Sequence, residues 1–92
     1  MTVRWTPTAL RDLGALAQHI GEDAPEAASN MVAKILSGIE ALRRQPEMGR
    51  RGRVAGTREL IIPPYIVAYR PTRDTIDLVA IIHGARRWPD VL

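Results

Sequence analysis

The spacing of apolar residues changes once along this chain, near Gly49, and the change divides the chain into two structural types. Before it, apolar side chains recur every three or four residues, which is the spacing of two amphipathic helices. Thr6 followed by Pro7 is typical of the start of the first helix, and Asp23 followed by Glu26 predicts a capping box at the start of the second. Very few residues separate the two helices, so we expect an antiparallel helical hairpin.

The second half of the chain is rich in β-branched and aromatic residues, and turn signals divide it into strands. The runs at about 57–62, 65–70 and 75–83 predict three strands. The segment 2–5 predicts a further strand that joins the sheet edge or pairs with a later strand. The order β-α-α-β-β-β indicates an α+β fold, with the antiparallel helical hairpin packed on one face of a small antiparallel sheet. The glycine-rich stretch 49–56 is the best candidate for a mobile loop.

The last run predicts a strand near the middle of the sheet. One set of its alternate positions is apolar throughout: Ile76, Leu78, Ala80 and Ile82. The other set is polar first and apolar later. This pattern predicts that one face of the strand lies under the helices and that the other is partly exposed.

Length and composition exclude several classes of protein. A chain of 92 residues is expected to form one domain over 1–92. Cysteine is absent, which excludes disulfides and zinc–thiolate sites, and the two histidines lack metal-ligand spacing. We therefore expect no metal and no cofactor. Neither a signal peptide nor an apolar run long enough to span a membrane is visible, so we expect a cytoplasmic protein without membrane contacts.

Positive charge is concentrated in the second half of the chain. The protein carries a net charge of +3, with −2 over residues 1–42 and +5 over residues 43–92, and Lys34 is its one lysine. Six of the sixteen residues in 43–58 are arginine. Such a stretch predicts contact with a polyanion such as nucleic acid, docking of an acidic protein segment, or a solvated connector.

Three further features are candidates for function. His83 ends the last strand, where a lone histidine is more often structural or merely exposed than catalytic. Tyr65 and Tyr69 lie on one sheet face, where they either contact a partner or pack across strands. Arg86, Arg87 and Trp88 belong to the residue types enriched at interface hot spots, although a tail folded back on the sheet is an equal alternative.

Together these stretches resemble toxins of the RelE/ParE superfamily, from bacterial type II toxin–antitoxin modules. The similar segments cover nearly the whole chain in the right order: "WTPTALRDLGALAQHI", "ALRRQPEMGRRGR", "GTREL", "YIVAY" and "IIHGARRWP". The resemblance implies a helical hairpin on a curved antiparallel sheet, in agreement with the pattern of apolar residues. It also implies a cognate antitoxin, ParD-like or similar, whose C-terminal segment wraps the toxin.

The resemblance leaves two activities open. ParE-like members inhibit DNA gyrase and are not nucleases, whereas RelE-like members cut mRNA in the ribosomal A site without a metal. The nuclease pattern has an arginine just after the tyrosine of the third strand, where this chain has Ile66, and a tyrosine near the C-terminus that this chain lacks. Its arginine at the end of the last strand is matched by Arg86. The ParE branch is therefore favoured, and we expect a gyrase inhibitor rather than an enzyme.

These comparisons define three sets of candidate residues. The expected target-binding residues are Arg50, Arg51, Arg53, Arg58, His83, Arg86, Arg87 and Trp88. The expected antitoxin-binding residues are Leu13, Leu16, Ile20, Tyr65 and Tyr69. Under the alternative nuclease hypothesis, the catalytic residues are Arg58, Arg70, His83 and Arg86.

Overall fold

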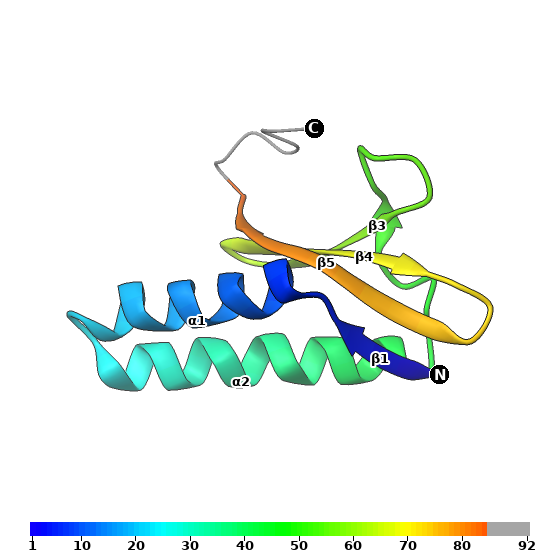
Figure 1. The fold of residues 1–92 in the computed structure, drawn as a ribbon. Helices are drawn as coiled ribbons and strands as arrows, with labels where there is room; N and C mark the ends of the chain where they lie inside the picture. The colour runs from blue at the N-terminus through cyan, green and yellow to red at the C-terminus, as the bar shows by residue number, and fades with distance from the viewer. Residues whose placement is uncertain (85–92) are drawn as a thin grey trace.

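The fold is a helical hairpin packed against one sheet, in a computed structural model that describes residues 1–84 (Figure 1). The elements are β1 (Thr2–Trp5), α1 (Pro7–Gly21), α2 (Pro25–Leu42), β2 (Arg50–Arg51), β3 (Arg58–Ile62), β4 (Tyr65–Pro71) and β5 (Thr75–His83). Figure 1 shows α1 and α2 side by side on one side of the sheet. The expected α+β class and element order are confirmed, with β2 as an addition.

The two helices begin differently, although both carry proline at their first positions. The Thr6 hydroxyl accepts a hydrogen bond of 3.1 Å from the backbone amide three residues later, which confirms the predicted cap of α1. The predicted capping box of α2 is wrong. Ala24 is the N-cap and its side chain forms no capping hydrogen bond, so Asp23 lies one position too early to fill that role. Pro25 takes the first helical position, where a residue without an amide proton leaves one fewer backbone donor unsatisfied.

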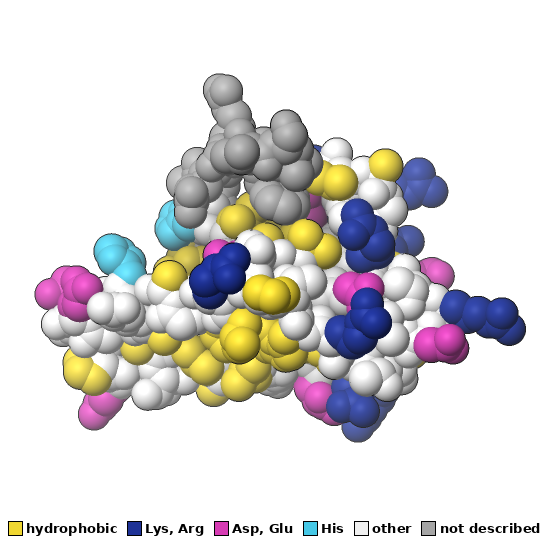
Figure 2. Space-filling model, viewed as in Figure 1, with side chains coloured by type: hydrophobic (Ala, Val, Ile, Leu, Met, Phe, Trp, Pro, Cys, Tyr) yellow, Lys and Arg dark blue, Asp and Glu magenta, His cyan; other side chains and the backbone are white. Residues whose placement is uncertain are grey.

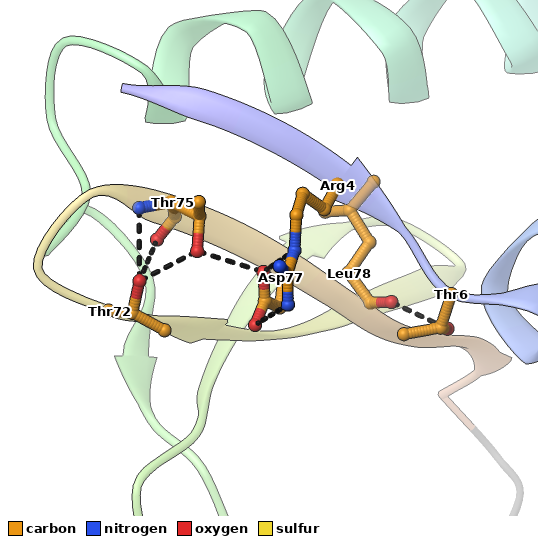
Figure 3. A network of polar contacts seen from close by, with 6 residues as sticks. All are labelled: Arg4, Thr6, Thr72, Thr75, Asp77 and Leu78. Atoms are coloured by element: carbon orange, nitrogen blue, oxygen red, sulfur yellow. Dashed lines mark hydrogen bonds and ion pairs between the residues drawn. The ribbon is translucent and has the colours of Figure 1, made fainter.

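The sheet is mixed, because its first strand joins it in parallel. Its order is β1-β5-β4-β3-β2, with β1 parallel to β5 and the remaining neighbours antiparallel. The antiparallel sheet expected from the sequence thus acquires one parallel edge strand. An ion pair of 2.9 Å between the Arg4 Nε and the Asp77 Oδ1 links β1 to β5 (Figure 3). Asp77 also accepts from Thr75, at the start of β5.

The alternation predicted for β5 is interrupted by a bulge. Ala68 pairs with Ala80, but the next residue, Tyr69, pairs with Leu78, so Val79 is the extra residue. The interruption brings Ile81 into the core cluster instead of Ala80. The expectation that Ala80 and Ile82 share a face with Ile76 and Leu78 is therefore wrong.

The core lies between the helical hairpin and the sheet face that it covers. Its buried members come from both layers: Ala9, Leu16, Ile35, Ile39, Leu42, Tyr65, Val67, Tyr69, Ile76, Leu78 and Ile81. Both tyrosines thus point toward the helices, and the cross-strand packing alternative holds for them. The side chains of these aliphatic residues and the two rings supply the burial that phenylalanine provides in other small domains.

Candidate target-binding surface

A buried carboxylate organises the arginine-rich stretch. Glu59, on β3, is only 1% exposed. Its Oε1 accepts from the Arg50 Nη2 at 3.1 Å, and its Oε2 accepts from the Arg53 backbone amide at 3.1 Å. The Arg53 guanidinium adds an ion pair of 3.3 Å. We call residues 50–58 the arginine arm. Because Glu59 joins its two sides, the arm is a folded hairpin and not the loose loop that the sequence suggested.

The tip of the arm is a compact turn that surrounds a hollow of about 440 Å³. The Gly52 amide donates to the Thr57 carbonyl at 2.8 Å, and the Thr57 hydroxyl donates to the Val54 carbonyl at 2.6 Å. Gly56 has a φ of 81°, a conformation that favours glycine. The hollow therefore has walls held by backbone hydrogen bonds, with the Arg51 and Arg58 positions on its lining.

Arg58 and Tyr69 hold the segment that connects α2 to the arm. The Arg58 Nη1 donates to the Gly49 carbonyl at 2.8 Å, and the Tyr69 hydroxyl accepts from the Gly49 amide at 2.9 Å. The same hydroxyl donates to the Pro46 carbonyl at 2.7 Å. Burial raises the pKa of the Tyr69 phenol above its ordinary value, although the hydrogen bond from Gly49 and the charge of Arg58 oppose the rise. Both side chains therefore stabilise the base of the arm through hydrogen bonds to its backbone.

These contacts divide the arginines predicted to bind a target. Arg50 and Arg53 are engaged by Glu59, and Arg58 by main-chain carbonyls. The Arg51 side chain is exposed and forms no ion pair or hydrogen bond with another of residues 1–84, although its backbone pairs with Arg58 in the sheet. In the view of Figure 2, most of the visible basic side chains lie on the right, at the end of the molecule away from the loop that joins α1 to α2. Arg51 is thus the arginine of the arm best placed to meet an external anion.

The end of β5 carries the second part of the candidate surface. His83 is exposed, and its ring contacts the Tyr65 ring edge-on with centroids 5.5 Å apart and planes at 78°. The two residues are also cross-strand neighbours in the sheet. Arg86, Arg87 and Trp88, which are predicted to bind the target, lie outside the described residues. Among the residues predicted to bind the target at the end of β5, His83 is therefore the one that the structure describes.

The residues of the nuclease hypothesis do not form one group in the described part of the chain. Arg58 pairs with Tyr69 and shares its sheet face, whereas the neighbouring Arg70 points to the opposite face. His83 pairs with Tyr65, four residues from Tyr69 along β4, which is about 13 Å of strand. Within residues 1–84, no three His, Asp or Glu side chains are grouped so that they could hold a metal ion.

The helical hairpin has an apolar outer face. Leu10 and Leu36 are 59% and 43% exposed. Between the two helices lies a hollow of about 390 Å³, which is lined by Ala17, Ala28, Ser29, Val32, Ala33 and Leu36. Hydrophobic side chains gather over α1 and α2 in Figure 2. Neither helix, among the described residues, is long and apolar enough to cross a membrane.

The residues expected to bind an antitoxin lie mostly beneath this outer face. Leu16 is buried, and Leu13 and Ile20 are half-buried against the core. Tyr65 and Tyr69 are 8% and 0% exposed, so the structure assigns both to the core instead of a partner surface. Leu36 is not among the residues predicted to bind an antitoxin. Its exposure depends on the angle at which α2 packs, which helical periodicity alone does not specify.

Comparison with known proteins places this fold in a family of bacterial toxins. Residues 3–88 match the family described as the ParE toxin of type II toxin–antitoxin system, parDE. The chain therefore belongs to the ParE toxin family and, more broadly, to the RelE/ParE superfamily of type II toxins.

The individual relatives carry both superfamily names. The chain is 41% identical over 92 residues to the putative toxin Y4kP of Sinorhizobium fredii, covering 98% of this chain and 95% of the relative. It is 38% identical over 85 residues to the toxin RelE2 of Caulobacter vibrioides, covering 91% and 96%. Similar solved structures are the chromosomal ParDE toxin–antitoxin system of P. aeruginosa and the RelBE2 toxin–antitoxin complex of Mycobacterium tuberculosis. The ParDE structure has a TM-score of 0.80 and 27% sequence identity, and the match covers 90% of this chain and 95% of that chain. The RelBE2 structure has a TM-score of 0.63 and 30% sequence identity, and the match covers 89% of this chain and 95% of that chain.

Proposed function

We propose that this type II toxin acts by binding and inhibiting DNA gyrase. The observation that carries the proposal is the residue after the first tyrosine of β4. The resemblance implies an arginine there in the nucleases, whereas this chain has Ile66, which is 5% exposed and apolar. An isoleucine offers neither charge to a phosphate nor a proton to a leaving group. The match to the ParE toxin family over most of the chain supports the same proposal.

The proposed gyrase-binding surface combines the arginine arm with the end of β5. Arg51 offers a guanidinium that is not engaged by other described residues, and His83 is exposed. Arginine forks bind carboxylates in a planar, bidentate manner, which suits an acidic segment of a protein target. Glu59 contributes by fixing the arm, and not by contacting the target, because it is buried.

A cognate antitoxin is the proposed second partner. The solved relatives are a ParDE system and a RelBE2 toxin–antitoxin complex. The outer face of the hairpin supports this proposal for the present chain, because Leu10 and Leu36 present apolar surface beside the hollow between α1 and α2. A ParD-like or similar antitoxin would place an amphipathic helix there.

Cleavage of ribosome-bound mRNA is the second candidate function. Two curated relatives, both from Caulobacter vibrioides, bear the names toxin RelE2 and toxin RelE3. His83 supports this alternative as well, because an exposed imidazole at a strand end is suited to proton transfer.

The two functions are separated by running two reactions on the same purified protein. One measures supercoiling by gyrase, and the other is cell-free translation followed by mapping of mRNA ends. We expect loss of supercoiling with intact mRNA. Cut mRNA beside normal supercoiling would overturn the gyrase proposal and make His83 a candidate catalytic residue.

The arm is tested by a pair of variants that remove the same charge. Arg51→Ala should raise the toxin concentration for half-inhibition of gyrase about tenfold, because a charged interface contact is lost. Arg11→Ala removes another exposed arginine, from α1, and should change the half-inhibiting concentration less than about twofold. Equal effects of the two variants would show that net charge, and not the arm, governs inhibition.

A further inference from the structure

Helix α1 supports β5 where the neighbouring strand stops. β1 pairs with β5 only from Thr75 to Leu78, although β5 continues to His83. The edge of β5 beyond Leu78 therefore has no β1 partner for its backbone groups. An unpaired edge of this kind needs other hydrogen-bonding groups when it is packed against a helix.

Two side chains from the α1 segment supply those groups. The Thr6 hydroxyl donates to the Leu78 carbonyl at 2.7 Å, as Figure 3 shows, and the Thr6 backbone amide donates to the same carbonyl at 3.3 Å. Six residues further along the chain, the Asp12 Oδ2 accepts from the Ile81 backbone amide at 2.9 Å. The two residues thus continue the role of a strand beside β5.

The hydrogen bond of Asp12 lies directly after the bulge in β5. Val79 is the extra residue, and the Ile81 amide follows two residues later. A bulge redirects the side chains that come after it, and its extra residue is left out of the regular ladder. Because Ile81 belongs to the core only with the bulge in place, the Asp12 carboxylate holds the backbone at the point where the direction of β5 is set.

We infer that Asp12 is a positioning residue, whose carboxylate holds the bulge of β5 and thereby sets where His83 leaves the sheet. Asp12 is a long way from the arginine arm in sequence and contacts β5 through one backbone amide. The inference rests on the proposed function, since the end of β5 is part of the proposed gyrase-binding surface. The bond itself concerns α1 and β5 alone and is tested separately.

The test compares Asp12→Ala with Asp12→Asn. Both substitutions remove one negative charge, but asparagine keeps a side-chain oxygen that can accept from Ile81. Exchange of the Ile81 amide with deuterium should become about tenfold to a hundredfold faster in Asp12→Ala, the factor for a hydrogen bond to a charged group. In Asp12→Asn it should stay within about fivefold. The His83 ring resonances should shift in the alanine variant and stay close to their wild-type positions in the asparagine variant.

Gyrase inhibition is measured on the same samples. We expect Asp12→Ala to need about tenfold more toxin for half-inhibition, with rescue by Asp12→Asn. Unchanged Ile81 exchange and unchanged His83 resonances in Asp12→Ala would overturn the inference. If the wild-type chain leaves gyrase active but Asp12→Ala still shifts the His83 resonances, the gyrase proposal is wrong and the positioning role of Asp12 stands.

A direct measurement covers the case in which Asp12→Ala does not fold. In the isotope-labelled wild-type chain, a scalar coupling through the hydrogen bond should link the Ile81 amide nitrogen to the Asp12 side-chain carboxyl carbon. Absence of this coupling, together with rapid Ile81 exchange in the wild type, would overturn the inference without any variant.

Discussion

Replacing Glu59 by glutamine should unfold the arginine arm and lower the stability of the whole domain. The substitution keeps the shape of the side chain but removes its charge. The carboxylate accepts from Arg50 and from both the backbone and the guanidinium of Arg53. A glutamine has one accepting oxygen, and its amino group would face a donor that it cannot satisfy.

The expected magnitude follows from the exposure of the three side chains. Removing one partner of a fully buried ion pair is destabilising by about 3–5 kcal/mol. Here Glu59 is buried, but the side chains of Arg50 and Arg53 are 58% and 40% exposed, so both guanidinium groups can regain water. We therefore expect a loss of about 2 kcal/mol in the free energy of unfolding, and a fall in Tm of about 10 °C for a domain of this size.

The assay is urea and thermal unfolding followed by circular dichroism, with Glu40→Gln as the control. Glu40 forms a pair of 3.6 Å with Arg43, and both of its members are well exposed. Such a pair contributes at most about 0.5 kcal/mol. A Glu59→Gln variant that loses no more stability than Glu40→Gln would refute the role given to the buried carboxylate.

Two further predictions concern the base of the arm. Tyr69→Phe should lose about 2 kcal/mol of stability in urea unfolding, because the Gly49 amide and the Pro46 carbonyl lose their shared partner; an unchanged midpoint would contradict this. Burial raises the pKa of the Tyr69 phenol in the folded state, so the neutral phenol contributes to the stability of the wild type. This contribution is present in full below about pH 10 and is lost as the pH rises through the folded-state pKa. Tyr69→Phe has no phenol to ionise, so its stability should not show this loss at high pH. Gly49→Ala should destabilise by about 1–3 kcal/mol, because its Cβ would lie 2.7 Å from the Tyr69 hydroxyl and 2.9 Å from the Glu59 carbonyl. Gly14→Ala, whose Cβ meets no atom within 4 Å, should instead stabilise α1 by about 0.5–1 kcal/mol, and equal Tm values for the two alanine variants would contradict the close approach at Gly49.

Local sequence signals predicted the elements wherever a few neighbouring residues decide them. The Thr6 hydroxyl caps α1 because the acceptor and the amide are three residues apart. The predicted start of α2 is wrong because Asp23 and Glu26 have the spacing of a capping box, whereas the helix begins at Pro25 with Ala24 as its N-cap. The parallel pairing of β1 with β5 joins residues more than 70 positions apart, so no local pattern could reveal it.

The candidate surface was predictable in composition but not in arrangement. Counting arginines identified the stretch that forms the arm. It did not show that Arg50 and Arg53 are engaged by Glu59 while Arg51 has no such contact among the described residues, because that division depends on which face of β3 the carboxylate occupies. The role inferred for Asp12 likewise rests on an amide 69 residues away.

The sequence by itself determined the two helices, the three longer strands of the second half and the excess of positive charge in that half. Apolar periodicity and turn residues depend on near neighbours in the chain, so they can be recognised in the sequence alone. The tertiary structure alone decided that Tyr65 and Tyr69 face the helices, that β5 bulges at Val79, and that Glu59 is buried under the arm. Alternation in a strand fixes which residues share a face, but only packing against the hairpin decides which face meets the helices.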